Sequence, residues 1–101
     1  MKISLFLKTE TISSFMRRCG YIPEGIDQKS GEIAFWRSIT GGRFPRFHIY
    51  AKEQHPDTYL VNLHLDQKAP SYSGTAAHSG EYEGPLVEQE AQRVSSLSLT
   101  S

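Results

Sequence analysis

The chain has 101 residues, 38% of them hydrophobic, and its 11 basic and 11 acidic residues cancel to no net charge. This length suits one domain with a modest core, and this composition excludes a disordered or fibrous chain. The one cysteine, Cys19, excludes an internal disulfide and favours a reducing compartment. No apolar run approaches the roughly 20 residues of a membrane span. We therefore expect a cytoplasmic protein with no membrane partner.

Charge is distributed unevenly along the chain. Residues 1–52 contain nine basic and four acidic residues, a balance of +5, whereas residues 53–101 contain two basic and seven acidic residues, a balance of −5. Such an imbalance indicates either a basic binding face or two halves that complement each other in the fold.

The clearest predicted element near the N-terminus is a helix that begins close to residue 12. Its apolar stripe has the i, i+3, i+4, i+7 spacing of a helix and comprises Ile12, Phe15, Met16 and Cys19. Thr9 or Thr11 can cap its first turn, and Gly20 suits the position just after its last turn. Before the helix, the alternation of Ile3, Leu5 and Leu7 indicates a short strand.

Three strands and a second helix are predicted after the first helix. The stretch Pro23–Gly31 is rich in turn residues. Strands are expected over residues 32–39, 44–52 and 58–66, with a turn over 54–57. Pro85 is a favourable first helical residue, and an apolar stripe follows it, made of Val87, Ala91 and Val94. The fold class is therefore α+β, in the order (β)αβββα: a three-stranded antiparallel meander, which the N-terminal strand can extend, with two helices packed on one face. Residues 1–94 form this domain, and 95–101 a frayed tail.

The apolar alternation of the last two strands predicts their register. Pairs whose residue numbers sum to 112 close the turn over His55, Pro56 and Asp57. This register places six apolar residues on one face: Phe47, Ile49, Ala51, Val61, Leu63 and Leu65. A slip of one residue would bury polar side chains, at a cost of about 1–3 kcal/mol for each unpaired group.

The same register collects six polar side chains on the opposite face, here named the polar patch: Arg46, His48, Tyr50, Asn62, His64 and Asp66. Arg46 faces Asp66, His48 faces His64, and Tyr50 faces Asn62, with directly opposed Cβ atoms about 4.5–5.5 Å apart. The patch is either a candidate site or an ordinary solvated sheet face with a surface ion pair.

A long segment, residues 67–84, follows Asp66 directly and can fold back over the polar patch. Loops of this length are usually functional or disordered. The segment adds four candidate site residues: Tyr72, His78, Glu81 and Tyr82.

Three chemistries fit these residues. His48 and His64 with His78 or Asp66 would hold zinc with one open coordination position, and Glu81 would act as a base. Alternatively, His48, His64 and His78 would carry out acid–base chemistry on a phosphodiester that Arg46 holds. The catalytic candidates are thus these three histidines and Glu81.

The third chemistry is binding without catalysis. Phosphates would be held by arginines of the first half of the chain, namely Arg17, Arg18, Arg37, Arg43 and above all Arg46. Tyr50 or Trp36 would stack on a base. The other residues expected to contact a ligand are Asn62, Asp66, Tyr72 and Tyr82. We expect a binding or regulatory domain for a phosphate-bearing ligand, above all nucleic acid. The alternatives are a small metal-dependent or histidine-based hydrolase and a protein-interaction module without a site. The oligomeric state is not indicated.

Two resemblances add to these expectations. Residues 45–48 (PRFH), 62–68 (NLHLDQK) and 77–82 (AHSGEY) resemble segments of a group of short uncharacterised bacterial proteins. That resemblance covers about residues 12–94 and implies a bacterial origin but no activity. The αβββα order, the helix exit at residues 17–21 and a strand-borne His48 are similar to the double-stranded-RNA-binding-like fold of HicA-type toxins. This similarity implies a catalytic histidine on the sheet.

Overall fold

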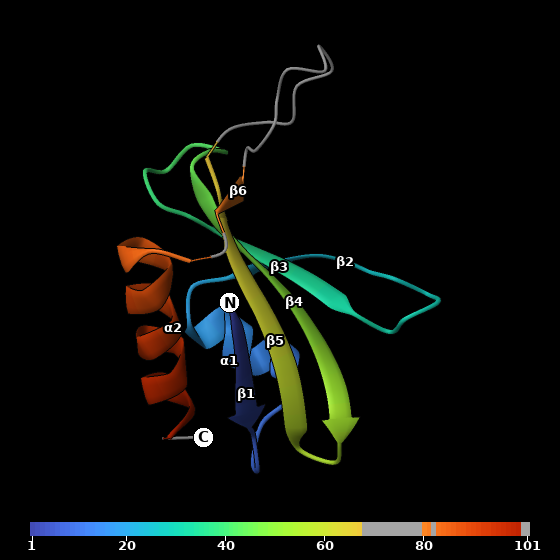
Figure 1. The fold of residues 1–101 in the computed structure, drawn as a ribbon. Helices are drawn as coiled ribbons and strands as arrows, with labels where there is room; N and C mark the ends of the chain where they lie inside the picture. The colour runs from blue at the N-terminus through green and yellow to red at the C-terminus, as the bar shows by residue number, and fades with distance from the viewer. Residues whose placement is uncertain (68–79, 82, 100–101) are drawn as a thin grey trace.

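The computed structural model describes residues 1–67, 80–81 and 83–99 (Figure 1). Two helices and six strands follow one another along the chain: β1 (Lys2–Phe6), α1 (Ile12–Arg18), β2 (Ile22–Ile26), β3 (Ile33–Ser38), β4 (Arg46–His55), β5 (Thr58–Asp66), β6 (Gly80–Glu81) and α2 (Pro85–Ser98). The predicted α+β class is confirmed.

The predicted three-stranded meander is wrong, because the sheet contains further strands on both sides of it. Its strand order is β1-β5-β4-β3-β2, all neighbouring strands are antiparallel, and β6 also pairs with β5. The predicted strands form β3, β4 and β5. The alternating N-terminal segment forms β1 on the free side of β5, where Ile3 lies opposite Val61.

Strand β2 forms where only turns were expected. Its sequence, Ile-Pro-Glu-Gly-Ile, contains a proline and a glycine, which usually end strands. Both are tolerated because β2 is an edge strand, paired on one side with β3. The pairing also shifts between Pro23 and Gly25, so Glu24 is the extra residue of a β-bulge.

The predicted register of β4 and β5 is confirmed from the Arg46–Asp66 pair to the Glu53–Tyr59 pair. The pairing then shifts by one residue, so β4 continues to His55 and the predicted turn over residues 54–57 is confined to Pro56 and Asp57. His48 pairs with His64, Arg46 with Asp66, and Tyr50 with Asn62. All six apolar residues of the predicted inner face are buried.

The two helices begin where the sequence indicates. Thr11 caps α1, because its side-chain oxygen accepts a hydrogen bond of 3.1 Å from the Ser14 amide. Gly20, just beyond α1, has φ of +95°, a value that favours glycine. Helix α2 continues through Ser98, beyond the predicted end of the domain at residue 94. Leu97 packs against the core and explains the longer helix.

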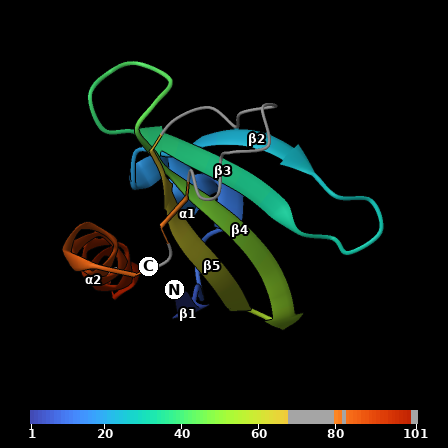
Figure 2. The ribbon, with the colours of Figure 1, turned by 45° about the horizontal axis from the view of Figure 1, so that its top comes forward.

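The core lies between the apolar face of the sheet and the helices. Figures 1 and 2 show α1 behind the sheet and α2 beside β1. Both helices contribute to one buried cluster, α1 through Ile12, Phe15 and Met16, and α2 through Val87, Ala91 and Val94. Neither helix is long and apolar enough to cross a membrane, as judged over the described residues.

Candidate functional site

The two histidines of the polar patch lie side by side and are buried. Their ring centroids are 4.9 Å apart, and the Tyr50 ring lies 4.6 Å from His48 and 5.8 Å from His64. His48 is 6% exposed and His64 is 7% exposed. A sheet face open to water would leave such side chains solvated, so the patch is not an ordinary polar surface.

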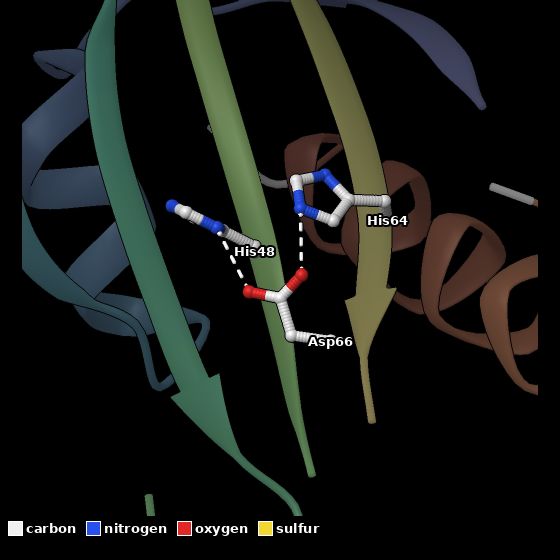
Figure 3. A group of neighbouring side chains, drawn as sticks. All are labelled: His48, His64 and Asp66. Carbon is white, nitrogen blue, oxygen red and sulfur yellow. Dashed lines mark hydrogen bonds and ion pairs between the residues drawn. The ribbon is translucent and has the colours of Figure 1, made fainter. Parts of the chain in front are cut away.

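Asp66 joins the two imidazoles (Figure 3). One carboxylate oxygen, Oδ2, lies 3.1 Å from His48 Nδ1, and the other, Oδ1, lies 2.9 Å from His64 Nε2. Asp66 sits on the same strand and face as His64, one side-chain repeat further along β5. The alternation of one strand therefore places a carboxylate beside both rings.

A second carboxylate reaches the site from the edge of the sheet. Glu24 Oε1 lies 2.9 Å from His48 Nε2, so both ring nitrogens of His48 face carboxylate oxygens. Only a doubly protonated ring can donate both hydrogen bonds at once. Alternatively, a metal ion can replace the proton at Nδ1 while Nε2–H donates to Glu24.

Arg46 neutralises part of the negative charge of Asp66 and Glu24. Its Nε donates to Asp66 Oδ2 at 3.3 Å, and its Nη2 lies 3.5 Å from Glu24 Oε2. The guanidinium also lies over two aromatic rings, 4.7 Å from Phe44 and 5.5 Å from Trp36. Arg46 is thus held at the site by both carboxylates and by aromatic contacts.

Burial also changes the protonation of His64. Desolvation lowers the pKa of His64 from its ordinary value, although the neighbouring Asp66 acts in the opposite direction. The neutral imidazole is therefore favoured, and this is the form that binds metal ions.

Three side chains are close enough to share a metal ion. His48, His64 and Asp66 each offer one ligand atom, and these atoms all lie within 4.8 Å of one another. Two imidazole nitrogens and one carboxylate oxygen are ligands typical of zinc and related transition metals.

A cavity of about 350 Å³ adjoins the site on the side of β2. Glu24 and Tyr50 belong to both the cavity lining and the site, and Asp27 and Glu32 add two further carboxylates. This lining favours cations over phosphates, because its charges are negative.

The described residues include part of the predicted site, and this part lies together. Arg46, His48, His64 and Asp66 meet as expected, with Tyr50 over the rings, and Asn62 lies opposite Tyr50. Tyr72, His78 and Tyr82 lie outside the described residues, as does the Glu81 side chain. The Glu81 backbone pairs with Leu65.

Sequence reasoning missed Glu24. A glycine inside a short apolar segment is a signal of a β-bulge, and Gly25 between Ile22 and Ile26 fits that signal. The signal could have indicated strand β2, but not that Glu24 reaches His48.

Comparison with known proteins adds no family to this description. No protein-family model matches the chain, and no similar protein was found among the curated proteins or the solved structures. The resemblances in sequence therefore remain expectations, and the side chains around His48 and His64 are the basis for inferring function.

Proposed function

We propose that this domain binds a divalent transition metal ion of the zinc type through His48, His64 and Asp66. The main evidence for this proposal is that these three side chains are buried or half-buried and that their ligand atoms lie within 4.8 Å of one another. Metal–ligand bonds of about 2.0–2.2 Å place tetrahedral ligand atoms about 3.3–3.6 Å apart, so the most distant pair would have to approach by about 1 Å.

The surroundings of the ligands support this proposal. In metal sites, a ligating histidine almost always donates its other N–H to a carboxylate, a backbone carbonyl or water, and a ligating carboxylate is itself hydrogen-bonded. Here Glu24 accepts from His48 Nε2, and Arg46 donates to Asp66. Two carboxylates against one guanidinium leave a local charge of −1 with neutral histidines, which attracts a cation.

Three protein ligands leave a fourth tetrahedral position for water or a substrate. Such an open position is the arrangement of catalytic zinc, in which the metal ion lowers the pKa of its bound water. Metal-assisted hydrolysis is therefore the reaction class that this site would support.

The predicted phosphate-bearing ligand stays a prediction. The arginine expected to hold the phosphate, Arg46, is already engaged by Asp66 and Glu24. Its contacts therefore favour an orienting role beside a metal ligand over direct capture of a phosphate.

Metal binding can be tested with Co²⁺, whose visible absorption reports a tetrahedral site. The chelator-treated protein should bind one equivalent of Co²⁺, and Zn²⁺ should displace it. Asp66→Asn, which preserves the side-chain shape, and His64→Ala should weaken binding about 100-fold or more. Losing a ligand should exceed the roughly 10–100-fold effect of losing an outer hydrogen-bond partner.

His55→Ala is the matched control, because His55 is an exposed histidine at the end of β4. It should bind Co²⁺ as the wild type does. Circular dichroism establishes that each variant is folded. Wild-type affinity no higher than that of Asp66→Asn would contradict the proposal and leave a purely structural ion-pair group.

A further inference from the structure

We propose that Glu24 is the positioning residue of this metal site, so that metal binding and attachment of edge strand β2 strengthen each other. The inference rests on the metal-binding function proposed above. It concerns a residue that would not itself contact the metal ion.

The path of the Glu24 side chain across the sheet is the first argument. Strand β3 separates β2 from β4, so the carboxylate must span two strand spacings, about 9–10 Å, to reach His48. Pro23 pairs with Phe35 and Gly25 with Ala34, so Glu24 is the bulged residue between these pairs. Bulges commonly redirect a side chain next to a functional site.

The residues of β3 leave room for this crossing. Ala34 pairs with Tyr50, and Trp36 pairs with His48, so both lie on the face of the polar patch. The Ala34 side chain is only a methyl group, so it does not block the Glu24 side chain on this face. The Glu24 side chain crosses β3 near Ala34, and its Oε1 lies 2.9 Å from His48 Nε2. Its second oxygen, Oε2, lies 3.5 Å from Arg46 Nη2.

The contact determines which nitrogen of His48 is available to a metal ion. With Nε2–H donating to Glu24, the lone pair of the neutral ring lies on Nδ1, which faces Asp66. Glu24 thereby selects the tautomer and ring orientation that complete the ligand set.

The coupling to β2 follows from thermodynamic reciprocity. If the Glu24–His48 contact raises metal affinity, a bound metal must stabilise that contact by the same factor. All five residues of β2 are exposed, so few buried contacts hold this edge strand. Beyond the backbone pairing of β2 with β3, the Glu24 contact should therefore be a main side-chain attachment of β2 to the sheet.

The first test compares Co²⁺ affinities of the full-length protein and three variants. Glu24→Ala should bind Co²⁺ about 10–100-fold more weakly than the wild type. Glu24→Gln should fall between them, because its amide oxygen still accepts from Nε2–H but carries no charge. Glu32→Ala is the control: it removes a carboxylate from the same cavity, and Glu32 has no contact with His48 among the described residues.

The second test is hydrogen exchange with and without Zn²⁺. Zn²⁺ should slow amide exchange in β2 of the wild type but not of Glu24→Ala. In both proteins, exchange in β1, the edge strand on the opposite side of the sheet, should change little.

The outcomes separate this inference from the proposed function. A wild-type protein that fails to bind Co²⁺ refutes the metal site itself. A wild type that binds Co²⁺, with both Glu24 variants within twofold of Glu32→Ala, refutes the positioning role and leaves the metal site standing. Equal protection of β2 in wild type and Glu24→Ala refutes the coupling.

Discussion

The buried imidazoles of His48 and His64 lie on the sheet face opposite the hydrophobic core. Burying an unpaired polar group costs about 1–3 kcal/mol on mutational scales. Asp66 offsets this cost for both rings, because each of its oxygens contacts one imidazole nitrogen. The Asp66 carboxylate therefore holds both histidine rings close to itself and to each other.

The surroundings of Cys19 suppress the reactivity of its thiol. It is 2% exposed, and burial raises the pKa of its thiol from an ordinary value of 9.0 to about 11. The nearby guanidiniums of Arg93 and Arg18 oppose this shift but are outweighed. The structure agrees with the interpretation of Cys19 as a small apolar core residue and places it at the C-cap of α1, just after Arg18.

We predict that iodoacetamide modifies Cys19 at pH 8 about 100-fold more slowly in the folded protein than in urea. The two-unit rise in pKa alone lowers the thiolate fraction by that factor, and burial adds to it. Mass spectrometry of quenched samples measures both rates. Comparable rates in the two states would show that Cys19 is accessible and reactive.

At the scale of elements, α1 depends strongly on its first turn. It has only seven residues, so the hydrogen bond from the Ser14 amide to Thr11 serves a large share of its unsatisfied amides. The sequence left Thr9 and Thr11 as alternatives, and the structure selects Thr11.

Replacing this cap should destabilise the protein measurably. Thr11→Ala should lower the free energy of unfolding by about 1 kcal/mol, within the 0.5–2 kcal/mol range for N-caps. Thr9→Ala removes a neighbouring exposed threonine and should stay within about 0.5 kcal/mol of the wild type. Urea titrations followed by circular dichroism compare the two, and equal losses would argue against capping by Thr11.

On the scale of the whole molecule, Glu90 joins helix α2 to strand β3 and to the connection between α1 and β2. It lies on α2 and is 4% exposed. Tyr21, which follows α1, donates a hydrogen bond of 2.6 Å from its hydroxyl to Glu90 Oε2. Arg93 donates to both carboxylate oxygens at 2.8 Å, and Arg37 of β3 lies 3.6 Å away. Burial and the adjacent carboxylate raise the pKa of the Tyr21 phenol, so it remains a donor.

Tyr21→Phe tests this connection with minimal change in packing. The variant leaves a buried carboxylate short of one donor, and hydrogen bonds to charged groups contribute about 1.5–3 kcal/mol. We expect a loss of that size in the free energy of unfolding at pH 7, measured by urea denaturation. A change below about 0.5 kcal/mol would show that Arg93 and Arg37 satisfy Glu90 without Tyr21.

Local patterns were sufficient for much of this fold. Period-2 alternation predicted that Phe47 and Leu65 share one face of the hairpin and that His48 and His64 share the other. Helical periodicity and capping residues predicted where both helices begin. These features depend on neighbouring residues or on two strands joined by a tight turn, so a single stretch of sequence contains the information.

By itself the sequence determined the hairpin register, and with it the proximity of His48, His64 and Asp66. The alternation near the N-terminus also indicated strand β1. Only the tertiary structure decided that β1 pairs with β5, that β2 extends the sheet, that Glu24 crosses β3 to His48, and that Glu90 is buried against Tyr21. The physical reason is that edge pairing and partners for buried charge join residues far apart in the chain: 24 positions separate Glu24 from His48, and 69 separate Tyr21 from Glu90. Taken locally, the proline and glycine of β2 predict a turn, and only pairing with β3 makes this segment a strand. Likewise, a glutamate is predicted to be exposed to solvent, and only hydrogen-bond donors from distant parts of the chain allow Glu90 to be buried.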